Sequence, residues 1–153
     1  MVVLVRMARD EDCAAIARLR RQTIRYVNAR DYPADVIRRW AIKENARTLR
    51  ASGAGCKRWV AVERSRIIGF CEHTFDGVLS RIYVHKDRLE TGIGSRLLAV
   101  AEASLERLGC KRIMLDSTVT AKGFYAAKRY RFVKKGTYGE NASEPVYKML
   151  KTL

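Results

Sequence analysis

The segment from Tyr83 to Leu98 constrains the fold more than any other part of the sequence. An apolar, strand-like run ends at Val84, a short charged loop follows, and Gly92-Ile93-Gly94 leads into an amphipathic pattern. The apolar residues of that pattern recur at helical spacing, at Ile93, Leu97, Leu98, Ala101, Leu105 and Leu108. The segment therefore predicts a strand, a glycine turn and a helix in direct succession.

This succession is typical of an anion-binding turn. The first N–H groups of a helix have no partners inside the helix, and the helix dipole favours negative charge beside them. Glycine lets a ligand approach the backbone closely. The Gly-x-Gly spacing alone is weak, because a chain with 10 glycines produces it by chance. Gly53-Ala54-Gly55 has the same spacing without a strand and an amphipathic helix beside it, and we interpret it as a loop.

Length and composition predict one globular domain over residues 1–153. The chain is 48% hydrophobic and has two prolines, and it is long enough to bury a core. The early apolar run is too short for a signal peptide, and no stretch reaches the roughly 18 apolar residues of a membrane-spanning helix. We therefore expect a cytoplasmic protein without membrane association.

Cysteine and histidine usage gives little support to a metal site. The four cysteines have no Cys-x-x-Cys spacing, and the two histidines, His73 and His85, are far apart in the sequence. We expect the cysteines to be reduced and mostly buried, and we predict no bound metal.

The net charge of +15 comes from an excess of Lys and Arg that is spread along the chain. Such a surface is typical of a soluble protein, and it also attracts anionic ligands or nucleic acid. No nucleic-acid-binding motif accompanies the charge, so a nucleic-acid partner is open but unsupported.

Hydrophobic patterns and turn residues predict a mixed α+β (α/β) fold. Helices are expected from Asp10 to Val27, from Pro33 past Trp40, over residues 93–108 and over residues 120–128, where Thr120 can cap the N-terminus. Strands are expected over residues 2–6, 59–63, 67–73, 78–84, 113–115, 132–138 and 146–151, with a polar loop over residues 139–145. This order gives a mixed, largely antiparallel sheet of about seven strands flanked by about four helices.

These residues carry a resemblance to the Gcn5-related N-acetyltransferase (GNAT) superfamily. Tyr83-Val84, the charged loop, Gly92-Ile93-Gly94, the amphipathic helix, the next strand and Phe124-Tyr125 resemble the family's motifs in order. The similarity covers the whole chain in element order and is most specific over residues 78–133. Tyr32-Pro33, Trp40-Ala41, Asp116 and Thr120-Ala121-Lys122 are similar to a group of small bacterial acetyltransferases.

The resemblance implies acetyl-CoA as cosubstrate. Backbone amides of the loop would bind its pyrophosphate, and its pantetheine arm would pair with the strand ending at Tyr83 and Val84, where family strands diverge. The cofactor-binding residues implied are Tyr83, Val84, Leu89, Glu90, Thr91, Gly92, Ile93, Gly94, Ser95 and Tyr125. The sequence departs from the family at Leu89, where Gln or Arg is usual, at Arg129-Tyr130, where Gly-Phe is usual, and at Glu90. The Glu90 carboxylate should weaken phosphate binding unless Arg88, Lys86 or Arg96 offsets its charge.

The resemblance places Tyr125 as the group that receives the departing thiolate. Proton transfer from a phenol of pKa about 10 to a thiolate of pKa about 8.5 is uphill by roughly 2 kcal/mol, so a hydrogen bond to the thiolate is as plausible as full transfer. Core packing beside Phe124 is the alternative role of Tyr125. The acceptor amine must lose a proton, and Glu72 and His73 are the candidates for the base. Asp116 is a third titrating group, and water could also remove the proton. Alternation along the strand puts Glu72 and His73 on opposite faces.

We therefore expect an acetyl-CoA-dependent N-acetyltransferase that acts on a primary amine of a small molecule, peptide or protein. A basic nucleic-acid- or ribosome-associated module and a non-catalytic CoA sensor are the alternatives on the same fold. The acceptor would contact residues 25–40 and 136–146. The net positive charge should disfavour polycationic acceptors unless acidic residues gather locally, and the candidates are Glu72, Asp76, Asp116 and Glu140. The sequence does not identify the acceptor, and it leaves a homodimer open.

Overall fold

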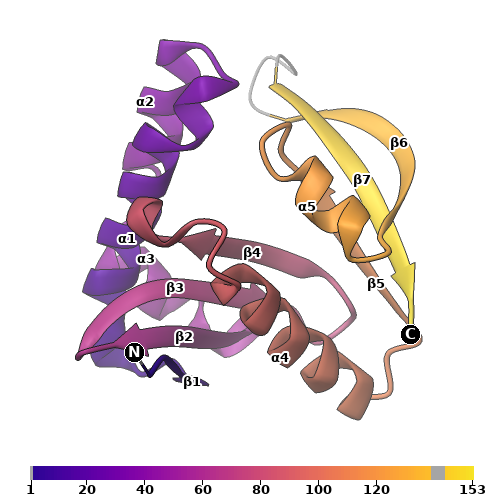
Figure 1. Ribbon diagram of the computed structural model, residues 1–153, viewed down its shortest axis with the longest axis horizontal. Helices are drawn as coiled ribbons and strands as arrows, with labels where there is room; N and C mark the ends of the chain where they lie inside the picture. Colours follow the sequence, from indigo (N-terminus) through magenta and orange to yellow (C-terminus); the bar gives the residue numbers. More distant parts are fainter. Residues whose placement is uncertain (1, 139–143) are drawn as a thin grey trace.

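The computed structural model describes residues 2–138 and 144–153, and it confirms the predicted α+β class. Five α-helices and seven strands lie within these residues (Figure 1). The strands are β1 (Leu4–Met7), β2 (Lys57–Glu63), β3 (Arg66–His73), β4 (Leu79–Val84), β5 (Arg112–Ser117), β6 (Arg131–Tyr138) and β7 (Glu144–Thr152). The helices are α1 (Cys13–Tyr26), α2 (Ala34–Ile42), α3 (Ala46–Ala51), α4 (Ile93–Arg107) and α5 (Lys122–Ala127).

The structure contains one helix that was not predicted, and one expected helix cap was wrong. The short helix α3 was not predicted, although Asn45 caps it by accepting a hydrogen bond from the Thr48 N–H at 3.1 Å. Thr120 does not cap α5, because its hydroxyl donates to Asp31 at 2.7 Å, and the hydroxyl of Thr118 accepts from the Ala121 N–H instead. Most of the polar loop expected between β6 and β7, including Glu140, lies outside the described residues.

The strands form two antiparallel sheets rather than one continuous sheet. The first has the order β1-β2-β3-β4, and the second has the order β5-β7-β6. Within the described residues, a single parallel bridge between Val78 and Met114 joins the two, beside the hydrogen bond from the Met114 N–H to the Gly77 carbonyl at 2.9 Å. Beyond that point β4 and β5 diverge, as Figure 1 shows.

Helices cover both faces of the first sheet. On one face α1 and α3 pack against Val60 and Phe70, whereas α4 packs on the other face against Ala61 and Cys71. Helix α5 covers the second sheet through Tyr125, which lies in the same apolar cluster as Leu115 and Met149. The apolar stripe predicted for residues 93–108 is therefore the face of α4 that enters the core.

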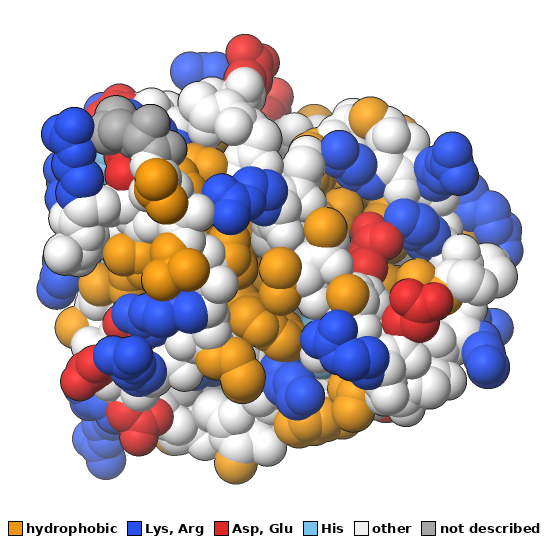
Figure 2. Space-filling model, turned by 60° about the horizontal axis from the view of Figure 1, so that its bottom comes forward, with side chains coloured by type: hydrophobic (Ala, Val, Ile, Leu, Met, Phe, Trp, Pro, Cys, Tyr) orange, Lys and Arg blue, Asp and Glu red, His pale blue; other side chains and the backbone are white. Residues whose placement is uncertain are grey.

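Charge is dispersed on the face drawn in Figure 2. Lys and Arg side chains lie there between apolar and acidic ones and do not gather into one patch. No helix in the described part of the chain combines the length and apolar character that crossing a bilayer requires.

Gly69 of β3 lets α4 approach the sheet closely. A Cβ at this position would lie 3.0 Å from Leu97 Cδ1, 3.1 Å from Ile93 Cγ2 and 3.2 Å from the Tyr83 carbonyl oxygen. We predict that Gly69→Ala lowers the free energy of unfolding by about 1–3 kcal/mol, because the added methyl overpacks this contact. Chemical denaturation measures the effect.

Gly123→Ala is the matched control. Gly123 lies in α5, and no heavy atom lies within 4 Å of a Cβ built there. Alanine favours the helix, so this variant should gain about 0.4–1 kcal/mol. Equal stability of both variants would contradict the close packing of α4 on Gly69.

Candidate active site

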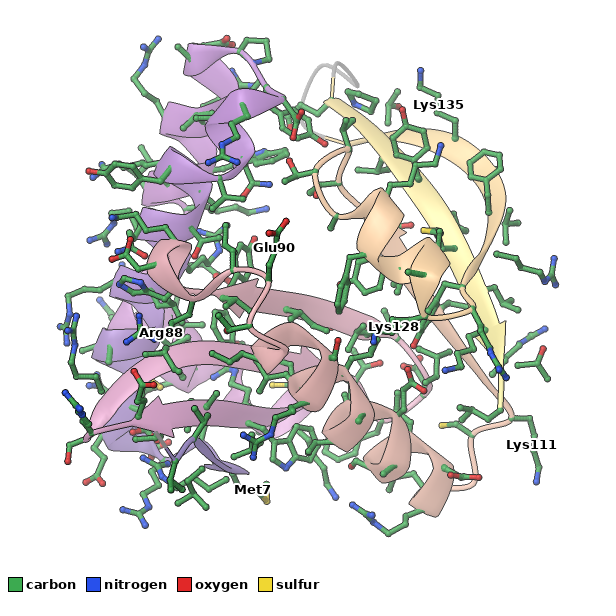
Figure 3. The ribbon with its side chains drawn as sticks, in the orientation of Figure 1. Met7, Arg88, Glu90, Lys111, Lys128 and Lys135 are labelled. Atoms are coloured by element: carbon green, nitrogen blue, oxygen red, sulfur yellow. The ribbon has the colours of Figure 1, made fainter. Side chains whose placement is uncertain are left out.

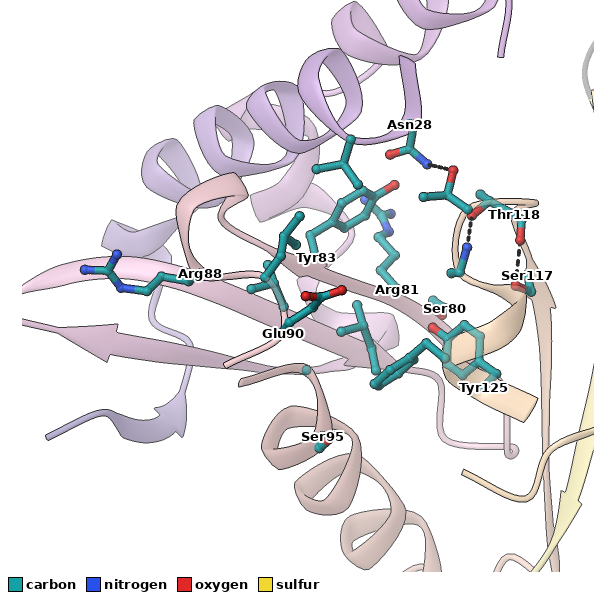
Figure 4. Close-up of a pocket in the computed structure, with 18 of the residues that line it drawn as sticks. Asn28, Ser80, Arg81, Tyr83, Arg88, Glu90, Ser95, Ser117, Thr118 and Tyr125 are labelled. Carbon is teal, nitrogen blue, oxygen red and sulfur yellow. Dashed lines mark hydrogen bonds between the residues drawn. The ribbon is translucent and has the colours of Figure 1, made fainter. Parts of the chain in front are cut away.

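A cavity of about 640 Å³ lies where β4 and β5 diverge. One part of its wall comes from β4 and the loop that leads into α4, and another comes from the end of β5 and from α5 (Figure 4). Val27 and Asn28 close the end beside α1. The remaining lining residues are Ser80, Arg81, Ile82, Tyr83, Val84, Arg88, Leu89, Glu90, Gly92, Gly94, Ser95, Asp116, Ser117, Thr118, Thr120, Ala121, Phe124 and Tyr125.

The edge of β4 that faces this cavity has no neighbouring strand beyond Val78 in the described structure. Its other edge pairs with β3, with Tyr83 opposite Phe70 and Val84 opposite Gly69. An open strand edge can accept an extended ligand through main-chain hydrogen bonds. The divergence of the two sheets therefore leaves room and backbone groups for an extended arm.

The N-terminus of α4 forms one end of the site. Gly92 is its N-cap and has a left-handed backbone, with φ of 85° and ψ of 0°, which glycine adopts without strain. No heavy atom lies within 4 Å of a Cβ built on Gly92, and a Cβ built on Gly94 would lie 3.5 Å from the Phe124 ring. The first-turn N–H groups of this 15-residue helix therefore open toward the cavity and can bind a phosphate.

Most of the sequence-derived cofactor candidates line the cavity. Thr91 and Ile93 do not: the Thr91 hydroxyl donates to the Arg88 carbonyl at 2.6 Å, which holds the loop, and Ile93 is buried in the core. The candidates that line the cavity are Tyr83, Val84, Leu89, Glu90, Gly92, Gly94, Ser95 and Tyr125.

The charge of Glu90 is not offset by Arg88 or Lys86. Arg88 pairs with Glu63 at 2.7 Å, and its side chain extends away from Glu90 in Figures 3 and 4. Lys86 pairs with Asp87 at 2.9 Å. Arg96 is exposed at the end of the first turn of α4 and has no ion pair among the described residues, so of the three basic residues it is the one left to balance Glu90.

Tyr125 is both a core residue and a cavity residue. It is 7% exposed, and its ring packs against Phe124 and Tyr130 with centroids 5.2 and 5.6 Å away. Burial raises the pKa of its phenol above the ordinary value, so the hydroxyl keeps its proton. Within the described chain this hydroxyl has no hydrogen-bond partner, so it is free to donate to a ligand.

The structure does not bring Glu72 and His73 to the cavity. Glu72 is 5% exposed and pairs with Arg58 and, at 3.4 Å, with Arg81. His73 is fully buried, with Nδ1 2.6 Å from the Thr74 carbonyl oxygen and its ring against Trp59, and burial lowers its pKa. Neither is among the described residues that line the cavity.

Asp116 does line the cavity. Its side chain is 52% exposed and pairs with Lys148 at 3.6 Å. Asn28 also lines the cavity and lies in the range expected to contact the acceptor, whereas sequence reasoning gave no role to Ser80 and Arg81. The signal available for Arg81 was strand alternation, which places it on the same face of β4 as Tyr83.

Residues 28–153 match the family described as an acetyltransferase (GNAT) domain. No curated protein matches the chain by sequence. Solved structures share its fold: a GCN5-related N-acetyltransferase from Rhodopseudomonas palustris has 23% identity and a TM-score of 0.92, over 100% of this chain and 99% of the other.

Two further solved structures contain the ligand expected for the family. The PaiA N-acetyltransferase of Thermoplasma acidophilum, in complex with coenzyme A, is 20% identical with a TM-score of 0.81, and each chain is covered completely. The acetyltransferase YncA of Salmonella typhimurium, with acetyl-CoA, is 17% identical with a TM-score of 0.69, over 100% of this chain and 95% of the other.

Gly94→Asp tests the phosphate end of the cavity. A Cβ at this position makes only ordinary van der Waals contacts, but the carboxylate would lie where a pyrophosphate is expected, so we predict at least tenfold weaker binding of acetyl-CoA. Isothermal titration calorimetry measures the affinity. Gly94→Asn is the matched control, because it has the same shape without the charge and should lose much less. Wild-type affinity of Gly94→Asp would remove residues 92–95 from the cofactor site.

Proposed function

The chain belongs to the family of GNAT acetyltransferases, and we propose that it is an acetyl-CoA-dependent N-acetyltransferase whose acceptor is a primary amine. One observation carries this proposal: a single cavity is lined by the left-handed glycine turn at the α4 N-terminus, the open edge of β4 and the hydroxyl-bearing Tyr125. These parts provide a phosphate site, a pairing edge and a hydrogen-bond donor.

Acetyl-CoA supplies the acetyl group and a thiol leaving group. In this proposal the first N–H groups of α4, around Gly92, Gly94 and Ser95, hold its pyrophosphate. The open edge of β4 at Tyr83 and Val84 holds the pantetheine arm. Leu89 need not abolish binding, because the phosphate contacts come from the backbone, whereas the Glu90 carboxylate disfavours the phosphate to the extent that Arg96 does not balance it.

The acceptor amine attacks as the neutral species. Its nitrogen forms a bond to the acetyl carbonyl carbon, the carbon–sulfur bond breaks, and the sulfur leaves with the bonding electrons. Tyr125 donates its O–H to that sulfur. Because burial raises the pKa of the phenol, stabilisation of the thiolate by a hydrogen bond is favoured over full proton transfer.

The amine must also lose a proton. Glu72 and His73 have no part in this step in our proposal, because neither borders the cavity within the described chain. Asp116 lines the cavity and reaches solvent, so it is our candidate for receiving the proton, directly or through water. The CoA sensor of the sequence analysis would use the same cavity and differs only in lacking turnover. On the face drawn in Figure 2 the basic side chains do not gather into one patch, which gives no support to a nucleic-acid module.

A screen of amines, amino acids and peptide N-termini with acetyl-CoA, monitored by thiol release, tests the proposal. Thiol release that depends on an amine is the expected result. Tight binding of acetyl-CoA with no release from any amine would favour a sensor.

Tyr125→Phe tests the donor role. We predict that kcat falls at least tenfold, because the thiolate loses its hydrogen bond, whereas the affinity for acetyl-CoA stays within about twofold. Steady-state kinetics and calorimetry separate the two effects. Tyr130→Phe is the control, since Tyr130 is also buried and packs against Tyr125 but does not border the cavity. If both variants turn over at the wild-type rate, Tyr125 has only a packing role.

A further inference from the structure

Arg81 connects the cavity to a buried network of charges. Glu72 pairs with Arg58 and, at 3.4 Å, with the Nε of Arg81. The other side of Arg81 pairs with Glu44 through Nη1, and Glu44 also lies 3.3 Å from the Nε of Arg20. Ion pairs thus join three guanidinium groups to two carboxylates, with one positive charge in excess among the described residues.

Two of the three guanidinium groups are used inside the fold. Arg20 is buried and donates through Nη1 to the Trp40 carbonyl at 2.7 Å. Arg58 is buried and donates to the Leu49 carbonyl and, at 2.6 Å, to the Ser52 hydroxyl. Arg20 thus joins α1 to α2, and Arg58 joins β2 to α3 and the residue after it. Both are held inside the fold, and neither lines the cavity in the described structure.

Arg81 is the member of the network that faces the cavity. Its side chain is 22% exposed, and its Nη2 has no acceptor among the described residues. Figure 4 draws it on the side of Asn28 and Tyr83, opposite Ser95 at the start of α4. The pyrophosphate site of the proposed function is therefore at the other end of the cavity, and the pantetheine arm carries no charge that could pair with Arg81.

Three guanidinium groups share two carboxylates, so the network as a whole lacks one negative charge. A carboxylate on the Arg81 guanidinium is the strongest common way to supply it. We propose that Arg81 binds a carboxylate of the acceptor, so that the acceptor is a small amino acid whose own amine is acetylated. This inference rests on the proposed function. The excess positive charge of the chain would also attract an anionic acceptor and repel a polyamine.

Other cavity residues at this end suit the amine of the same molecule. The Nδ2 of Asn28 donates to Thr120 at 3.4 Å, which leaves its Oδ1 as an acceptor without a partner among the described side chains. Ser80, which Figure 4 draws between Arg81 and Tyr125, and Asp116 add a hydroxyl and a carboxylate elsewhere in the lining. A carboxylate held by Arg81 would thus leave the amine among hydrogen-bond acceptors.

Matched acceptors test the inference directly. For each of several amino acids, kcat/KM is compared with that of its amide and of its decarboxylated amine. We expect the acid to exceed both by at least about tenfold. The ammonium group of the amide is more acidic than that of the acid, so more of the amide is present as free amine at neutral pH. A higher kcat/KM for the acid would therefore not be due to a larger share of free amine. Equal kcat/KM for acids and decarboxylated amines would overturn the inference.

Arg81→Gln should lower kcat/KM for the acids by about 10- to 100-fold and change that for the decarboxylated amines less than about threefold. The variant leaves two guanidinium groups and two carboxylates in the network, so the fold should keep its melting temperature to within a few degrees. Arg81→Lys should retain part of the discrimination. Lys111→Gln, on the exposed loop before β5, removes the same net charge far from the cavity and should change neither value.

Binding separates failure of this inference from failure of the proposed function. Calorimetry of amino acids with the protein saturated by CoA requires no turnover, and carboxylate-dependent binding that Arg81→Gln abolishes would support Arg81 even in an inactive protein. Thiol release from amines regardless of a carboxylate would overturn the inference and leave the acetyltransferase standing. No amine-dependent release and no amino-acid binding would overturn both.

Discussion

The rest of the structure depends on the divergence of β4 and β5. Backbone N–H and C=O groups at a strand edge need partners, and in a continuous sheet the next strand supplies them. Here the described residues supply one parallel bridge, at Val78 and Met114, and then the strands separate. The helix that follows β4 begins at the open end of that gap, and α5 follows β5 on its far side. The β4–α4 segment and the β5–α5 segment, which supply most of the site residues, are thus held apart where the hydrogen bonding between β4 and β5 stops.

The open end of the gap is held by contacts between distant parts of the chain. Buried Glu144, at the start of β7, accepts from Arg39 at 2.5 Å and from Trp40 at 2.8 Å, both on α2. Tyr32 accepts from the Val119 N–H at 2.8 Å, directly beside the lining residues Thr118 and Thr120. These bonds join the N-terminal helices to the second sheet, so the width of the cavity is fixed at one end by the bridge and at the other by α2.

Local patterns sufficed for much of the fold and for one half of the site. The short apolar runs of β2 and β3, the apolar stripe of α4 and Gly92-Ile93-Gly94 are each contained in a few consecutive residues, and so the sequence predicted them. The break between the two sheets and the short helix α3 depend on packing between distant segments. The same is true of side-chain roles: Glu72 looks like a free carboxylate in the sequence, but the fold pairs it with Arg58 and Arg81. The role proposed for Arg81 likewise depends on a distant residue, because Glu44 pairs with Arg81 only in the folded chain.

The interrupted sheet also has a consequence for the energetics of the whole molecule. A ligand that pairs with the edge of β4 would fill the gap between the sheets, and its binding free energy would then add to the stability of the folded state. At a donor concentration of about 100 times Kd this linkage amounts to about 2.7 kcal/mol. The concentration of the donor would therefore help to set the free energy of unfolding of the whole chain, although the donor contacts only one edge of one sheet.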